Sequence, residues 1–191
     1  MPTRLTLICH GATAATRDAR FPRDEPLEPK EAARAAALAG GLRRADLVLT
    51  GPAQAARQTA AEFAPEAVVE AALRDCDYGD WSGRSIAEIH AEDPDGLAAW
   101  LTEPDAAPHG GESIEALCAR ISVWLDACRA RGGHIVAITH NTVIRAALLA
   151  VLDAPLASFW RIDIEPLGLL DLRSDGTRWS LRASAAAARN P

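Results

Sequence analysis

Two histidines of the sequence each come directly after a short apolar run. His10 follows residues 5–9 (LTLIC), and His140 follows residues 134–139 (HIVAIT). Continuous apolar runs of this length are typical of strands that are buried on both faces of a sheet. Ligands of α/β sheets bind at the carboxyl ends of the strands. The two imidazoles are therefore predicted to share a site.

The chemistry predicted for this site is binding and transfer of an anionic group. A helix is expected to start at Asn141 and Thr142, and it would direct backbone N–H groups and a positive dipole end toward the histidines. Such an arrangement favours a phosphoryl group. A histidine can attack phosphorus as a nucleophile, and a nearby acid can protonate the leaving alkoxide. Asp75 and Asp77 lie in a loop-like segment and are candidates for that acid.

A plainer interpretation stays open at this point, because a single histidine at a strand end is often a structural or surface residue. The presence of two histidines at equivalent strand ends is what favours a site.

The elements that must position these residues alternate between strands and helices. Strands are expected at residues 5–9, 46–50, 67–69, 134–139, 159–164, 167–172 and 179–181. Helices are expected at residues 29–42, 53–63, 85–91, 96–101, 114–131 and 142–152. This order predicts an α/β fold, a three-layer sandwich with a mostly parallel central sheet and helices on both faces. We expect one domain over residues 1–182 and a flexible tail over residues 183–191.

The bulk properties limit the function classes. The chain has 191 residues, 49% of them hydrophobic, and a formal net charge of −6. This charge argues against nucleic-acid and anionic-membrane partners, which need a concentrated basic face. No apolar run approaches the roughly 18 residues of a membrane helix. No export signal is recognisable and the four cysteines show no C-x-x-C spacing, so we expect free thiols and a cytoplasmic location. A homodimer is one assembly open to such a chain.

Several segments resemble the motifs of the histidine phosphatase (phosphoglycerate mutase-like) superfamily, in the order of that family. Residues 9–13 (CHGAT) resemble its Arg-His-Gly-Glu-Thr signature, and residues 139–145 (THNTVIR) resemble its Ser-His-Gly-Gly-Val-Ile-Arg motif. Further resemblances lie at residues 24–27 (DEPL), 52–60, 73–83 (LRDCDYGDWSG) and 110–113 (GGES). Together they span roughly residues 4–172 and imply the fold of this family.

The resemblance implies roles for individual residues. His10 would be the phosphorylated nucleophile, His140 the second histidine that holds the phosphoryl group, and Asp75 the proton donor. The expected substrate-binding residues are Cys9, Gly11, Thr13, Arg20 and Asn141. The resemblance implies no metal and no organic cofactor. The short segment between Asp75 and Gly111 is similar to the small phosphatases of the family rather than to the mutases.

The sequence departs from the family pattern at two arginine positions, which are Cys9 and Ala55 here. Arg57 is no obvious replacement for the second, because two residues along a helix are about 200° apart; we expect it to face solvent. Arg20 is the preferred replacement for the lost positive charge, from a loop that also carries Arg17 and Arg23. Arg74 and Arg84 are weaker candidates, and a solvated loop is the alternative interpretation of the cluster.

The function expected from these observations is hydrolysis of a small phosphorylated or otherwise anionic substrate, with altered phosphate recognition. The alternative is a weak or inactive family member that binds an anionic ligand or a protein partner. Cys9 leaves two further alternatives open, an activated thiol or a soft-metal site with His10 and His140. A buried cysteine at a strand end is also simply a small apolar residue.

Overall fold

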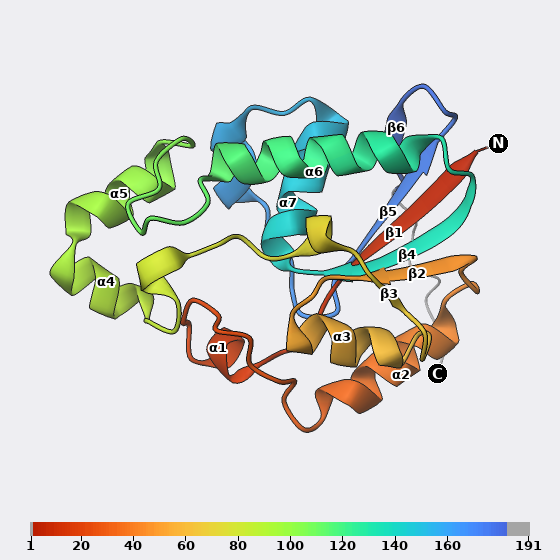
Figure 1. The fold of residues 1–191 in the computed structure, drawn as a ribbon, viewed down its shortest axis with the longest axis horizontal. Coiled ribbons are helices and arrows are strands. Elements are labelled where there is room, and N and C mark those ends of the chain that lie inside the picture. The colour runs from red at the N-terminus through yellow and green to blue at the C-terminus, as the bar shows by residue number, and fades with distance from the viewer. Residues whose placement is uncertain (1, 183–191) are drawn as a thin grey trace, which may run out of the picture.

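A mixed six-stranded sheet with the order β3-β2-β4-β1-β5-β6 forms the centre of the molecule (Figure 1). The computed structural model describes residues 2–182, so the tail expected at residues 183–191 lies outside the described residues. The strands are β1 (Thr3–Cys9), β2 (Leu47–Thr50), β3 (Val68–Val69), β4 (Gly133–Thr139), β5 (Leu169–Ser174) and β6 (Trp179–Leu181).

The parallel part of the sheet contains both strands that precede the histidines. β1 pairs with β4, β4 with β2 and β2 with β3 in parallel, whereas β5 pairs antiparallel with β1 and β6. In the β1–β4 register Cys9 lies opposite Thr139. The two strands therefore end at the same level, and the next residues, His10 and His140, leave the sheet side by side.

Helices cover both faces of the sheet, as the strand–helix alternation predicts (Figure 1). One face carries α6 (Ile114–Arg129) and α7 (Asn141–Leu152), and the other carries α2 (Glu31–Gly41) and α3 (Gln54–Ala61). Alternate residues of β1 belong to different hydrophobic clusters. Leu5, Leu7 and Cys9 pack in the cluster that contains α6 and α7, and Ile8 packs in the cluster of α3. This alternation is the two-residue period of a strand that is buried on both faces.

Short helices surround the carboxyl ends of the parallel strands. They are α1 (Ala14–Arg17), α4 (Ile86–Glu92), α5 (Pro94–Thr102) and the 3-10 turns η1 (Ala71–Leu73), η2 (Gly79–Trp81) and η3 (Leu156–Arg161). Their boundaries follow from local capping. Ser85 and Glu88 form a capping box at the start of α4, and Pro94 stands in the first turn of α5. No helix within residues 2–182 has the length and apolar character needed to cross a membrane.

The strand expected at residues 159–164 is wrong. The chain forms the 3-10 turn η3 there, and its two consecutive aromatic residues both pack in the same hydrophobic cluster. Phe159 is fully buried, and the ring of Trp160 lies 4.5 Å from that of Trp100. A strand would direct consecutive side chains to opposite faces. The next strand begins at Leu169 rather than at residue 167, since Leu167 has a left-handed φ of 63° within a turn.

Candidate active site

His10 and His140 are in contact at the carboxyl ends of β1 and β4. Their ring centroids are 4.8 Å apart and the rings meet edge to face at 73°. His140 is the N-cap residue of α7, which begins at Asn141 as the sequence predicts. His140 is buried and His10 is partly exposed. The strand register therefore brings together the two histidines that the sequence places 130 residues apart.

One nitrogen of His10 is fixed by the backbone. Nδ1 lies 2.7 Å from the carbonyl oxygen of Gly11. Because that oxygen can only accept, Nδ1 carries the proton and Nε2 keeps its lone pair. Burial, and then the neighbouring His140, lower the pKa of His10 to about 4. The imidazole is therefore neutral near pH 7, which is the form that can attack an electrophile.

Asp75 is held against His140 as a carboxylate. Its Oδ2 lies 3.2 Å from Nδ1 of His140, while Oδ1 accepts hydrogen bonds from Thr142 Oγ1 and from the amide of Cys76. Burial raises the pKa of Asp75, but the charge of His140 and these hydrogen bonds outweigh burial and bring the pKa down to about 2. Asp75 is thus ionised near pH 7 in the unliganded protein.

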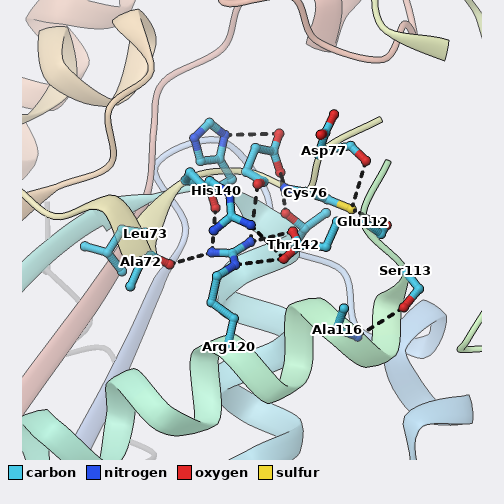
Figure 2. A network of polar contacts seen from close by, with 12 residues as sticks. Ala72, Leu73, Cys76, Asp77, Glu112, Ser113, Ala116, Arg120, His140 and Thr142 are labelled. Carbon is cyan, nitrogen blue, oxygen red and sulfur yellow. Dashed lines mark hydrogen bonds and ion pairs between the residues drawn. The ribbon is translucent and has the colours of Figure 1, made fainter. Parts of the chain in front are cut away.

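The loop that carries Asp75 is anchored to α6 by Arg120, as Figure 2 shows. The guanidinium of Arg120 donates to the carbonyl oxygens of Ala72, Arg74 and Asp75 at 2.5–3.3 Å. The same guanidinium forms an ion pair of 2.7 Å with Glu112. Sequence reasoning missed Arg120. A signal existed, because this charged residue directly precedes Ile121, which belongs to the apolar face of the helix.

Two clefts open on either side of His10, and both are also lined by Thr13, Pro22, Asp75 and Tyr78. The first, of about 250 Å³, is further lined by Cys9, Phe21 and Asn141, and we call it the Phe21 cleft. The second, of about 310 Å³, is further lined by Ala55 and His140, and we call it the His140 cleft. The nucleophile candidate thus stands where the two hollows meet.

Three of the expected binding residues already form hydrogen bonds within the protein. The amide of Gly11 donates to Thr59 Oγ1 at 3.1 Å, and the hydroxyl of Thr13 caps α1 by accepting from the amide of Thr16. Arg20 lines the Phe21 cleft, but its guanidinium donates to Glu88 and to a backbone carbonyl, both at 3.0 Å. Asn141 and Cys9 line the same cleft at the start of α7 and the end of β1.

The other candidate arginines either form ion pairs with acidic residues or lie outside the two clefts. Arg17 pairs with Asp18 and Glu28, Arg74 with Glu112, and Arg84 with Glu92. Arg23 lines neither cleft. Ala55 does line the His140 cleft, and Arg57 is exposed, as the helical rotation predicts.

Cys9 behaves as a small buried residue. Burial, and then the charge of Asp75, raise the pKa of its thiol to about 12, so the thiolate of an activated nucleophile is disfavoured. Within residues 2–182 no group of three or more His, Cys, Asp or Glu side chains is arranged to hold a metal ion.

Arg145 places a second overlooked charge near Cys9. It lies one turn after Asn141 on α7, its guanidinium carbon is 5.6 Å from the ring centre of Phe159, and its Nε is buried without a hydrogen-bond partner among the described residues. Its positive charge lowers the pKa of the Cys9 thiol, although burial dominates there. Arg145 lines neither of the two clefts, so it acts on Cys9 only through its charge.

Comparison with known proteins identifies relatives of this fold and site. The chain matches the model of the histidine phosphatase superfamily (branch 1) over residues 5–186. A bifunctional protein of Mycobacterium tuberculosis is 30% identical over 188 residues, which cover 92% of this chain and 52% of that protein. The chain thus spans about half the length of this relative and of two further mycobacterial proteins that it matches equally well.

Other relatives are similar over most of their own length. The glucosyl-3-phosphoglycerate phosphatase of Mycobacterium tuberculosis is 29% identical over 174 residues, covering 82% of this chain and 78% of that protein. The structure of the mycobacterial glucosyl-3-phosphoglycerate phosphatase with VO3 superimposes with a TM-score of 0.84 at 27% identity, covering 96% of this chain and 99% of that chain. An adenosylcobalamin/alpha-ribazole phosphatase of Salmonella typhimurium is 28% identical over 174 residues, covering 85% of this chain and 86% of that protein.

Proposed function

This chain belongs to the histidine phosphatase superfamily (branch 1), and we propose that it hydrolyses phosphate monoesters through a phosphohistidine formed on Nε2 of His10. The observation that carries the proposal is the contact of His10 with His140, with Asp75 against the second ring, where two clefts meet. The phosphatases among its relatives support a hydrolase.

The first step is attack of His10 on phosphorus. The Nε2 lone pair forms the N–P bond while the bond from phosphorus to the ester oxygen breaks, and its electron pair leaves with the alkoxide. The hydrogen bond from Nδ1 to Gly11 O holds the ring in the tautomer that this attack needs. It also stabilises the positive charge that the ring gains.

The leaving alkoxide takes a proton from the His140–Asp75 pair. We assign this proton to His140, whose Nδ1 lies 3.2 Å from Oδ2 of Asp75, because Asp75 has a pKa of about 2 and carries no proton in the unliganded protein. Asp75 then acts by stabilising the charged ring. Direct donation from Asp75, the role that the family resemblance implies, requires its pKa to rise when the substrate dianion enters.

The second step returns the enzyme to its starting state. Water attacks phosphorus and gives its proton to His140, which was left neutral by the first step. The N–P bond breaks, its electron pair returns to Nε2 of His10, and inorganic phosphate leaves. One water molecule is consumed and one alcohol is released for each cycle.

Phosphate recognition is altered in this proposal, because Cys9 and Ala55 supply no charge. The phosphoryl oxygens are bound instead by the imidazole of His140, the side chain of Asn141 and the N–H groups of the first turn of α7, whose N-cap makes no side-chain hydrogen bond. A single arginine on a transferring phosphoryl group is worth roughly 10³–10⁵ in rate. We therefore expect slow turnover.

The test is release of phosphate from a panel of phosphate monoesters, together with trapping of an acid-labile phosphoprotein. Wild type should form both, and His10→Ala should abolish both. His90→Ala is the matched control, since His90 is exposed on α4. If wild type gives neither product or His10→Ala keeps full turnover, the proposal is wrong.

A second candidate function is binding of an anionic ligand without turnover. It is favoured by the apolar residues at the two arginine positions and by the ion pairs that occupy Arg20 and Arg74. Calorimetric binding of phosphate monoesters by a wild-type protein that forms neither free phosphate nor phosphohistidine would select this candidate.

A further inference from the structure

The charged residues that line the His140 cleft are mainly acidic. Four carboxylates border it, from Asp24, Glu25, Asp75 and Asp77. Arg74 is the only arginine or lysine among the described residues that line it, and its guanidinium is paired with Glu112 at 3.0 Å. Asp75 lies against His140, whereas Asp24, Glu25 and Asp77 border the cleft without a cationic partner among the described residues.

The three outer carboxylates are held by backbone amides rather than by cations. Asp24 accepts from the amide of Gln54, Glu25 from that of Arg23, and Asp77 from that of Gly79. Within the described residues none of these three acids forms a salt bridge. Each side chain is thus oriented while its charge stays available for a ligand.

An independent observation points to a ligand in this cleft. His140 lines it, is only 4% exposed, and has a buried Nε2 without a hydrogen-bond partner among the described residues. A buried polar nitrogen without a partner is costly, so its partner is expected to arrive with a bound molecule. The charge of Glu25 partly offsets the lowering of the pKa of His10, so Glu25 lies within electrostatic range of the reacting centre.

We infer that the substrate is a phosphate monoester whose alcohol part carries a protonated amine, and that this ammonium group binds among Asp24, Glu25 and Asp77. The inference rests on the proposed function and names the substrate class for the same site. A phosphate monoester carries about 1.5 to 2 negative charges near pH 7, and like charges repel at short range. An ammonium group in the same molecule turns the acidic border from a repulsive into an attractive feature.

The Phe21 cleft does not select for a positively charged group on the substrate. Its walls include Phe21, Ile86 and Ile164, and its arginine, Arg20, is paired with Glu88. Apolar walls discriminate poorly between groups of similar size. Selection for a positive charge therefore depends on the His140 cleft.

Three probes that differ in one terminal group test the inference. They are 2-aminoethyl phosphate, its uncharged isostere propyl phosphate, and 2-carboxyethyl phosphate. We expect 2-aminoethyl phosphate to bind most tightly in calorimetry and to have the highest kcat/KM, by about fivefold or more over propyl phosphate, as for a favourable partly exposed ion pair. The carboxyethyl compound should be the poorest of the three.

Two variants locate the effect. Glu25→Gln and Asp77→Asn remove one charge each but keep an oxygen that can accept the same backbone hydrogen bond, so the fold should be retained. Each should shrink the preference for the amine by a few-fold. Asp105→Asn is the matched control, because Asp105 is exposed and lines neither cleft. Thermal unfolding of all variants checks that they are folded.

Binding measurements test the preference for an ammonium group, and turnover measurements test the proposed hydrolysis. If calorimetry shows equal affinities or tighter binding of propyl phosphate, the inference is overturned, whatever the turnover. If the amine is preferred in binding but no probe is hydrolysed, the ammonium subsite stands as a ligand-binding site and the proposed hydrolysis fails. If all probes are hydrolysed without preference, the hydrolase stands and the inference fails.

Discussion

Cys9 and Ala55 occupy the positions at which the family motifs that this sequence resembles carry arginine. Ala55 lines the His140 cleft and Cys9 the Phe21 cleft, so a side chain at either position reaches the space around His10. Neither residue offers a charge. The two imidazoles and the start of α7 remain as donors, and they are weaker partners for a dianion than a guanidinium fork.

Restoring the two arginines should therefore raise phosphatase activity. The double variant Cys9→Arg with Ala55→Arg is expected to increase kcat/KM by at least about tenfold, a conservative fraction of what one arginine can contribute. The increase should require His10, so the triple variant with His10→Ala should lose it. Phosphate release measures the effect, and circular dichroism confirms folding. An unchanged rate in a folded double variant would contradict a phosphatase that is weakened only by the missing charges.

At the scale of elements, the loop that carries Asp75 is positioned by α6 and by the segment before it. The guanidinium of Arg120 donates to three backbone carbonyl oxygens in or next to that loop. The amide of Glu112 donates to the carbonyl oxygen of Asp77 at 2.8 Å. A Cβ atom at Gly111 would lie 2.1 Å from the same oxygen, which explains why glycine is needed there. These contacts make α6 a positioning element for Asp75 and, through it, for His140.

Removing the anchor should impair the site more than the fold. Arg120→Met is expected to lower kcat by about tenfold or more. It should also destabilise the protein by roughly 1–3 kcal/mol, because three carbonyl oxygens lose their donor and Glu112 keeps only the partly exposed Arg74 as its partner. Adding Glu112→Leu removes the carboxylate that has lost its buried partner, so it should recover part of the stability but not kcat.

The comparison of these two variants separates positioning from stability. Phosphate-release kinetics and urea unfolding supply the two measurements, and Arg129→Met on the same helix is the control, since its partner Asp126 is mostly exposed. Recovery of kcat together with stability in the double variant would show that Arg120 acts only through the fold.

At the scale of the whole molecule, the site makes folding sensitive to acid. The pKa of His10 falls from 6.5 to about 4 on folding, chiefly through burial, so below pH 6.5 the unfolded chain takes up a proton that the folded protein does not. Stability therefore decreases as the pH falls from about 6.5 to 4. Asp75 adds a second loss at lower pH, where the unfolded carboxyl is protonated and the folded one, with a pKa of about 2, is not.

The free energy of unfolding should thus drop between pH 7 and pH 4.5 more steeply in wild type than in His10→Gln. The difference is at most about 3 kcal/mol, since one pKa unit corresponds to about 1.4 kcal/mol. Urea unfolding at several pH values measures it. His90→Gln should behave as wild type, because His90 is exposed. Identical slopes for His10→Gln and wild type would contradict a lowered pKa of His10 in the folded protein.

Local patterns in the sequence determined most of the architecture. The apolar runs before His10 and His140 predicted two buried strands, and the helical period predicted that Arg57 points away from Ala55 and faces solvent. Motif resemblance predicted the family. These features depend on neighbours within a few residues, where the periods of strand and helix are directly readable.

Only the tertiary structure decided which polar groups are free and which are engaged. Arg20 was the preferred phosphate ligand, yet it pairs with Glu88, 68 residues away in the sequence. Arg120 was overlooked, yet it holds the loop of Asp75 across 45 to 48 residues. The protonation states of His10 and Asp75 likewise depend on burial and on partners from other elements. The physical reason is that side-chain pairing and desolvation depend on distance in space, which local sequence periodicity does not encode.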